Sequence, residues 1–212
     1  MAEITADGAP APARHASLRT VVAASSLGAT FEWYDFFVFG SLTQVISKTF
    51  FSGLNETAGY VAALALFGVG FAFRPIGALA FGRIGDRVGR KGAFLITVVL
   101  MGGATVAIGL LPSYATAGIA APILLLLMRI VQGFALGGEY GGAAIYVAEH
   151  APPGARGRST SWVQTAAAFG LFAALLVIFL TRLSLFKAFG PAAFDAWGWR
   201  IPFLFSAGLL AV

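Results

Sequence analysis

Charged residues are scarce in this sequence, and cysteine is absent. Only 11% of the 212 residues are charged, against about a quarter in a soluble domain, so polar surface is too limited for a water-soluble fold. The lack of cysteine excludes disulfides, thiolate metal sites and thiol catalysis. Neither histidine, His15 or His150, has a histidine or acidic partner at metal-ligand spacing. We therefore predict no metal, no other cofactor and no enzymatic centre.

Apolar residues instead dominate, at 58% of the sequence and a mean hydropathy of +0.85. Runs of about 20 apolar residues indicate membrane-spanning helices, and they are too long for the alternating strands of a barrel. Residues 1–17, rich in Ala and Pro, are predicted to be a disordered cytoplasmic tail without a signal peptide. Residues 18–212 are predicted to form a six-helix transmembrane bundle whose sixth helix is truncated. The expected spans are 18–46, 58–81, 93–111, 119–147, 160–180 and 199 onward.

Basic residues flank these spans unevenly, which predicts the orientation of the chain. A net charge of +5 would suggest nucleic-acid binding in a soluble protein, but here the cations lie beside apolar runs, and no nucleic-acid partner is expected. Eight Lys or Arg lie on the side of the amino terminus and four on the other, so the amino terminus is predicted to be cytoplasmic in the cell (inner) membrane. Trp197 and Trp199 suit an interfacial belt before the sixth span.

The segment Gly82-Arg83-Ile84-Gly85-Asp86-Arg87-Val88-Gly89-Arg90-Lys91 joins the second and third spans. It is too charged to enter lipid, and its glycines permit a tight turn. It is not a phosphate-binding P-loop, because Gly92 rather than Ser or Thr follows the lysine and no strand precedes it. The segment resembles the G-x-x-x-D-R-x-G-R-[RK] signature of the major facilitator superfamily.

A second pattern begins at Arg129 within the fourth span. Gly133, Gly137 and Gly141 recur every four residues, a spacing that predicts close approach of a neighbouring helix. Arg129 lies about 16 Å into the span, where a guanidinium must face a cavity or an acid. The run resembles the family's fourth-helix motif R-x-x-Q-G-x-x-x-G, which implies a part for Arg129 in proton coupling. The alternative is that Arg129 only joins helices through a buried ion pair.

The first span contains Glu32-Trp33-Tyr34-Asp35-Phe36, again near the membrane midplane. Three-residue spacing places both carboxyl groups on one helix face, and two close carboxylates in a low dielectric do not easily ionise together. One of them is therefore expected to take and release a proton, unless both simply neutralise Arg129. Trp33 and Tyr34 either line a solute cavity or pack against neighbouring helices or lipid.

Several further motifs resemble the metabolite:proton symporter branch of this superfamily. They are Gly28-x-x-x-Glu32-Trp33-Tyr34-Asp35-Phe36, Arg74-Pro75-Ile76-Gly77, Gly137-Gly138-Glu139-Tyr140 and Gly198-Trp199-Arg200-Ile201-Pro202-Phe203. We predict a cytoplasmic gate in which Arg74 and Glu139 join the charged segment, formed by Arg74, Gly82, Gly85, Asp86, Arg87, Gly89, Arg90 and Glu139. Snorkelling side chains at the interface are the alternative.

The resemblance implies an all-α membrane fold, one six-helix half of a major facilitator transporter built from two inverted three-helix repeats. It also implies proton-coupled symport of a small organic acid or zwitterion by alternating access. The expected partners are the solute, protons, the lipid bilayer, and a missing carboxy-terminal half or a second copy. A proton-driven exporter of hydrophobic compounds and a non-transporting half-transporter or scaffold remain the competing interpretations.

Overall fold

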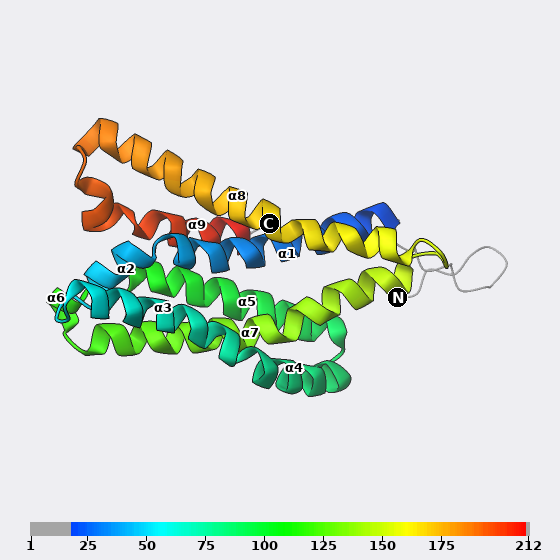
Figure 1. Cartoon of the computed structure of the whole chain (residues 1–212). Coiled ribbons are helices and arrows are strands. Elements are labelled where there is room, and N and C mark those ends of the chain that lie inside the picture. Colours follow the sequence, from blue (N-terminus) through cyan, green and yellow to red (C-terminus); the bar gives the residue numbers. More distant parts are fainter. Residues whose placement is uncertain (1–17, 211–212) are drawn as a thin grey trace, which may run out of the picture.

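The computed structural model describes residues 18–210, and within that range the side chains at 19, 21, 90, 91, 139–146, 150, 209 and 210 lie outside the described part. The predicted tail over residues 1–17 also lies outside it. The described residues form helices joined by short turns, with no strand among them (Figure 1). The helices are α1 (Leu18–Ser41), α2 (Thr43–Phe50), α3 (Glu56–Ala72), α4 (Arg74–Val88), α5 (Arg90–Leu110), α6 (Tyr114–Ala117), α7 (Ala120–His150), α8 (Arg156–Phe189), η1 (Phe194–Gly198) and α9 (Arg200–Leu210).

The first two predicted spans are each divided between two helices. The first is interrupted at Leu42, between α1 and α2, where the Thr43 hydroxyl donates to the Gly40 carbonyl at 2.7 Å. The second is interrupted at Phe73, directly before Arg74 and Pro75, because proline has no N–H with which to continue the hydrogen bonds of α3.

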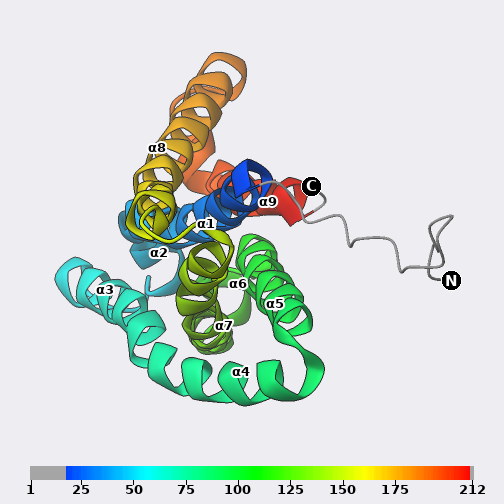
Figure 2. The ribbon, with the colours of Figure 1, turned by 90° about the vertical axis from the view of Figure 1, so that its right-hand side faces the viewer.

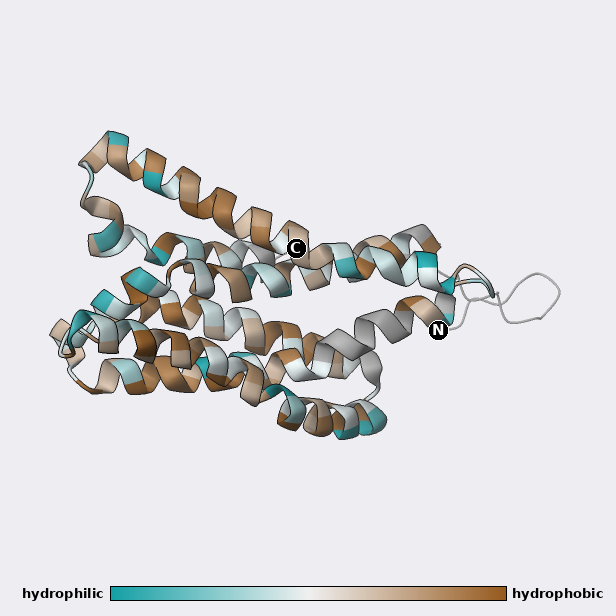
Figure 3. Cartoon of the chain, viewed as in Figure 1, coloured by the Kyte–Doolittle hydropathy of each residue, from teal (hydrophilic) through white to brown (hydrophobic). Residues whose placement is uncertain are grey.

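Four stretches of the described chain are long and apolar enough to cross a membrane. They are 56–88, 92–110, 120–138 and 156–189. Neither α1, which carries Glu32 and Asp35, nor the short α9 is among them. Figure 3 shows apolar residues along α8 and hydrophilic residues near the far end of α4. The sixth predicted helix begins at Arg200, one residue after the predicted start of that span.

The packing repeats itself between the first three and the last three spans. Helix α1 packs along α8, and α7 packs in the same way along α3 and α4. Helices α5 and α9 pack against each other, and they also contact α7 and α1, respectively (Figure 2). Exchanging spans one to three with spans four to six therefore preserves the pattern of neighbours, as the predicted inverted repeats require.

Glycines let α7 approach α3 and α4 closely. A Cβ atom built on Gly133 would meet the backbone of Gly70, and one built on Gly137 would meet the backbone of Arg74. On the opposite side, a Cβ on Gly77 would meet the backbone of Phe134. Small residues on both helices bring the backbones into contact, which is how membrane helices associate without a hydrophobic driving force. The surroundings of the third predicted packing glycine, Gly141, lie outside the described part.

We expect Gly133→Ala to destabilise the bundle, because the methyl group would be forced against backbone atoms that cannot rotate away. Overpacking of this kind costs about 1–3 kcal/mol. The matched control is Gly68→Ala on α3, since nothing lies within 4 Å of a Cβ there. Thermal unfolding in detergent should show a lower midpoint for Gly133→Ala alone. Equal midpoints for the two variants would contradict the close packing.

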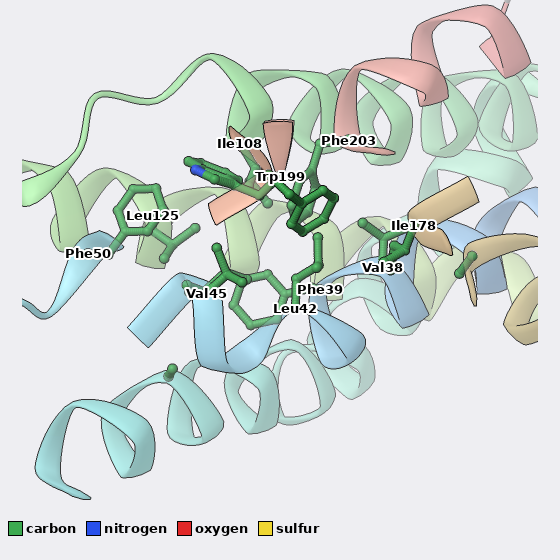
Figure 4. Close-up of a cluster of buried hydrophobic side chains, with 14 of the residues drawn as sticks. Val38, Phe39, Leu42, Val45, Phe50, Ile108, Leu125, Ile178, Trp199 and Phe203 are labelled. Atoms are coloured by element: carbon green, nitrogen blue, oxygen red, sulfur yellow. The ribbon is translucent and has the colours of Figure 1, made fainter. Parts of the chain in front are cut away.

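A large apolar cluster fills the end of the bundle where α2 lies (Figure 4). Val38, Phe39 and Leu42 from the first span meet Ile108, Leu125 and Ile178 from three other helices. Trp199 is fully buried in this cluster, with its ring 5.7 Å from that of Phe50 and 6.0 Å from that of Phe203. The predicted interfacial position is therefore wrong for Trp199. The helical turn of η1 rotates it inward, whereas Trp197 remains 44% exposed.

Candidate proton-coupling site

The two acidic residues of α1 are both buried, with 5% of Glu32 and 4% of Asp35 exposed. The Ser206 hydroxyl on α9 donates a hydrogen bond of 2.6 Å to Asp35 Oδ1. The Thr105 hydroxyl on α5 lies beside the same carboxyl group, and it donates a hydrogen bond of 3.0 Å to the Met101 carbonyl. Asp35 thus lies at the junction of α1, α5 and α9, the first, third and sixth spans.

Arg129 on α7 is 1% exposed, and its guanidinium is bonded on three sides. Nη1 donates to Gln132 Oε1 at 2.8 Å, while Nη2 and Nε donate at 3.3 and 3.4 Å to the carbonyls of Phe67 and Leu66 on α3. The charge also lies over the Phe39 ring, at 4.0 Å from its centroid. Three of the five N–H donors of the guanidinium are used in these bonds.

Gln132 extends the guanidinium's contacts toward α5. Its Nε2 donates to Thr105 Oγ1 at 2.8 Å, and the Thr105 hydroxyl lies against the Asp35 carboxyl. A line of neighbouring polar side chains therefore runs from Arg129 through Gln132 and Thr105 to Asp35 and ends at Ser206. We call these five residues the polar line. It joins α7, α5, α1 and α9 in the interior of the bundle.

The polar line differs from the direct ion pair expected between Arg129 and an acid of the first span. Among the described residues, no salt bridge joins Arg129 to Asp35 or to Glu32. Glu32 has an interaction of its own, whose partner is not among the described contacts. Arg129 reaches Asp35 only through two intervening side chains, because the α5 segment that carries Thr105 lies between them. Arg129 and Asp35 are therefore linked indirectly, through intervening side chains, and do not form the direct ion pair.

The aromatic residues beside the acids act in helix packing. The Tyr34 hydroxyl donates to the Pro202 carbonyl of α9 at 2.7 Å, and only 1% of the residue is exposed. Trp33 stacks on Phe37 with centroids 5.5 Å apart, and its Cβ would lie 2.5 Å from a Cβ on Gly170 of α8. Of the two alternatives from the sequence, the packing role fits both side chains in this structure.

The predicted cytoplasmic gate is arranged differently from the expectation. The charged segment is mostly helical, since α4 runs through Gly82, Gly85 and Asp86 to Val88, and only Gly89 has a positive φ, of 90°. Arg87 and Asp86 are exposed at this end of α4. Gly89 alone supplies the left-handed turn that glycine adopts readily, so the tight turn occupies one residue.

Arg74 does not join the charged end of α4. It begins that helix, so about 18 Å of helix separates it from Asp86. Its guanidinium lies over the rings of Phe71 and Phe36, at 4.2 and 5.0 Å from their centroids. The expected closeness of Arg74 to Asp86 is therefore wrong, because the two residues lie near opposite ends of α4. The side chains of Arg90 and Glu139 lie outside the described part, and their roles stay predictions.

A narrow recess, too small to hold a water molecule, lies beside the guanidinium of Arg129. It is lined by Phe36, Gly70, Met101, Arg129, Gln132, Gly133 and Leu136. The recess is mostly apolar, with Arg129 and Gln132 as its polar groups. Arg129 and Gln132 of the polar line thus border the recess. Asp35 does not line it and lies against Ser206 of α9.

Three residues of the polar line were missed by sequence reasoning. Gln132 was present in the R-x-x-Q-G motif, but its side chain was given no role. Thr105 and Ser206 are single hydroxyls in apolar helices, at 0% and 2% exposure. A hydroxyl residue in an otherwise apolar membrane helix indicates a polar contact with another helix. The sequence does not say which helix the hydroxyl faces.

Comparison with known proteins agrees with this architecture. A family model described as "sugar (and other) transporter" matches residues 20–211, nearly the whole chain. The chain belongs to this family. Among its relatives, the proline/betaine transporter of Escherichia coli K12 is 46% identical over 194 residues, which are 91% of this chain and 38% of that protein. The citrate-proton symporter of Salmonella typhi is 39% identical over 92% of this chain and 44% of its own length.

Solved structures give the same fold. The xylose transporter XylE from E. coli, in a partially occluded inward-open conformation, superposes with a TM-score of 0.76 at 22% identity, over 92% of this chain and 48% of that one. The predicted membership of the major facilitator superfamily and the all-α half-transporter fold are confirmed. Members of the family are membrane transporters rather than enzymes. The chain spans less than half the length of the curated relatives it matches.

Proposed function

We propose that this chain forms one half of a symporter that couples protons to a small organic acid or zwitterion by alternating access. The polar line is the observation that supports the proposal most directly. A charged side chain inside the membrane costs several kcal/mol, and such groups mark ion and solute pathways. Here a buried guanidinium is linked to a buried carboxyl group through side chains that can rearrange their hydrogen bonds.

In this proposal Asp35 carries the proton, with Glu32 one turn away as a second candidate. Proton binding removes a negative charge from α1 and changes the hydrogen bonds that Thr105 and Ser206 make with it. Through Gln132, the change reaches Arg129 and the α3 carbonyls that hold it. A proton can thereby shift the balance between two arrangements of the helices, provided that it binds one arrangement better.

Arg129 is the proposed contact for the solute. Two of its N–H donors are not used in the hydrogen bonds to Gln132, Leu66 and Phe67, and the side chain borders the recess. A guanidinium recognises a carboxylate through paired hydrogen bonds. The relatives described above are named for transport of proline, betaine and citrate, which all carry a carboxylate. A carboxylate is therefore the chemical group that we expect the solute to contain.

We infer that the solute site is completed by a second six-helix unit. In this superfamily the solute binds between two halves. This chain corresponds to 38% and 44% of the two relatives described above. Either a carboxy-terminal half or a second copy of the chain would supply the other wall.

The placement of basic residues supports a cytoplasmic amino terminus in the inner membrane. The start of α1, the end of α4 and the start of α8 lie at one end of the bundle, whereas α2, α6 and η1 lie at the other (Figure 1). Exposed Arg83, Arg87, Arg156 and Arg158 lie at the first end. Exposed Lys48, Arg182 and Lys187 lie toward the second. An excess of Lys and Arg is typical of the cytoplasmic side.

Transport assays in proteoliposomes test the proposal. The protein expressed from the complete reading frame, and this chain alone, would be supplied with radiolabelled proline, glycine betaine, citrate and shikimate, with and without a pH gradient. We expect accumulation of at least one carboxylate-bearing solute to require a gradient that is acid outside. Solute-driven proton movement in the opposite direction would indicate an exporter, and absence of uptake across the panel would contradict the proposed solute class.

A further inference from the structure

Two adjacent residues of α1 are bonded to one turn of α9. The Tyr34 hydroxyl donates to the Pro202 carbonyl, and the Asp35 carboxylate accepts a hydrogen bond from the Ser206 hydroxyl, four residues further along α9. All four residues are buried. A serine hydroxyl inside a helix can bond to its own backbone four residues back, but that of Ser206 is directed across to α1 instead.

Thr105 contacts the same carboxyl group from the other side. Its hydroxyl has a single proton, which it donates to the Met101 carbonyl at an oxygen–oxygen distance of 3.0 Å and can alternatively donate to Asp35. The oxygen of the same hydroxyl accepts a hydrogen bond from Gln132. Thr105 can therefore change its bonding when Asp35 changes its charge, without any movement of α5.

Charged groups near Asp35 come from α1, α7 and α9, and Arg74 of α4 lies over the Phe36 ring of α1. On α1 itself Glu32 is one turn earlier, and Tyr34 is adjacent. On α7, Arg129 is separated from Asp35 by Gln132 and Thr105, and on α9, Arg200 lies at the start of the helix, bonded to the Leu111 carbonyl. The described side chains of α5 bring only Thr105 to the carboxyl group, and the basic residues of α8 are exposed. The hydrogen bond from the Ser206 hydroxyl is thus the direct contact of this carboxylate among the described side chains, with the Thr105 hydroxyl beside it.

We propose that Ser206 is a positioning residue that sets the proton affinity of Asp35 and makes the contact between α1 and α9 depend on protonation. This inference deepens the proposed function and rests on it for its role in transport. An ionised carboxylate accepts hydrogen bonds from both hydroxyls, whereas a protonated carboxyl group has one fewer acceptor site and gains a donor. The Asp35–Ser206 bond therefore weakens when a proton binds, while the Tyr34–Pro202 bond beside it keeps its donor and acceptor.

The two hydrogen bonds between α1 and α9 allow an effect on the Asp35 carboxylate to be separated from a loss of helix contact. Removing either the Ser206 hydroxyl or the Tyr34 hydroxyl loosens the same contact between α1 and α9. Only the first removal takes a hydrogen bond away from the carboxylate. A merely structural role of Ser206 would therefore give Ser206→Ala and Tyr34→Phe the same phenotype.

The test is a pH titration of the full chain in lipid nanodiscs by difference infrared spectroscopy. The protonated carboxyl group of Asp35 is identified as the carbonyl band that disappears in Asp35→Asn. We expect Ser206→Ala to move the midpoint of that band to higher pH by about one to two units, because the hydrogen bond from Ser206 favours the charged form of the carboxyl group. Ser206→Thr, which keeps the hydroxyl, should restore the midpoint of the unmodified chain.

Two controls complete the design. Ser161→Ala removes an exposed hydroxyl of α8 whose bond in the described part of the chain is to the carbonyl of Arg158, and it should leave the midpoint unchanged. Tyr34→Phe should shift it much less than Ser206→Ala. An unchanged midpoint in Ser206→Ala, or equal shifts in Ser206→Ala and Tyr34→Phe, would overturn the inference.

The titration does not require transport, so the two proposals can fail separately. A shifted midpoint in a protein whose uptake ignores the pH gradient would support the role of Ser206 and contradict proton coupling. Gradient-driven uptake with an unshifted midpoint would support proton coupling and contradict the role of Ser206.

Discussion

Arg129→Gln is expected to abolish proton-driven accumulation of the solute, with a loss of at least about 100-fold in the initial rate. The glutamine is too short to reach the carbonyls of Leu66 and Phe67, and it lacks the charge that a solute carboxylate would contact. Losing about 3 kcal/mol of interaction corresponds to this loss of rate. The measurement is uptake of radiolabelled solute in proteoliposomes with an imposed pH gradient.

Two other arginine substitutions serve as controls for this result. Arg182→Gln removes a guanidinium that is 54% exposed and forms a 3.5 Å salt bridge with Asp195, and exposed pairs of this kind contribute little. Its uptake should match that of the unmodified protein. Arg129→Lys keeps the charge but not the fork of donors, so it should recover only part of the rate. Normal accumulation by Arg129→Gln would exclude the polar line from coupling.

The span pattern and the buried charges could be predicted from the sequence because they depend on local composition. Runs of apolar residues identify membrane helices, and an ionisable residue in such a run must be turned inward. Glu32, Asp35 and Arg129 are buried as this argument requires. Family motifs then placed six spans in one half of a transporter. Neither step needs to know which helices touch.

The partners of each buried side chain could not be predicted in the same way. The sequence placed the acids of α1 opposite Arg129, whereas Asp35 faces Thr105 and Ser206. Which way a helix face points is set by packing between residues far apart in the chain, here between positions 35 and 206. A small rotation of α1 about its axis decides whether Asp35 contacts Arg129 directly or only through other side chains. Amino-acid composition does not encode that rotation.

The ends of α3 and α4 are difficult to predict from the sequence for a related reason. Glycines and charges in residues 82–91 suggested a loop, but a helix end exposed to water tolerates both, and α4 continues to Val88. The break falls instead at Phe73, where Pro75 removes a backbone donor. Arg74 is consequently held over aromatic rings inside the bundle rather than at its charged end. The gate predicted from the sequence therefore combined Arg74 with the charged end of α4, although the length of this helix separates the two.

Asp35→Asn is expected to separate solute movement from the pH gradient. The amide is similar in size to the carboxyl group and can still accept a hydrogen bond from Ser206, but it cannot bind and release a proton. Accumulation should therefore fall to the level seen without a gradient. The accumulation ratio falls about tenfold for each 1.4 kcal/mol of driving force lost. Exchange of labelled for unlabelled solute, which needs no net proton movement, should persist.

Asp195→Asn is the matched control, because Asp195 is exposed and bonds only to Arg182 in the described part of the chain. Accumulation by that variant should follow the gradient as in the unmodified protein. The comparison of accumulation with exchange distinguishes lost coupling from lost folding, since a misfolded protein would perform neither. Full accumulation by Asp35→Asn would contradict the role of Asp35. It would assign the proton to Glu32, the second carboxyl group of the same helix face. The double variant Glu32→Gln, Asp35→Asn would then be the one expected to exchange solute without accumulating it.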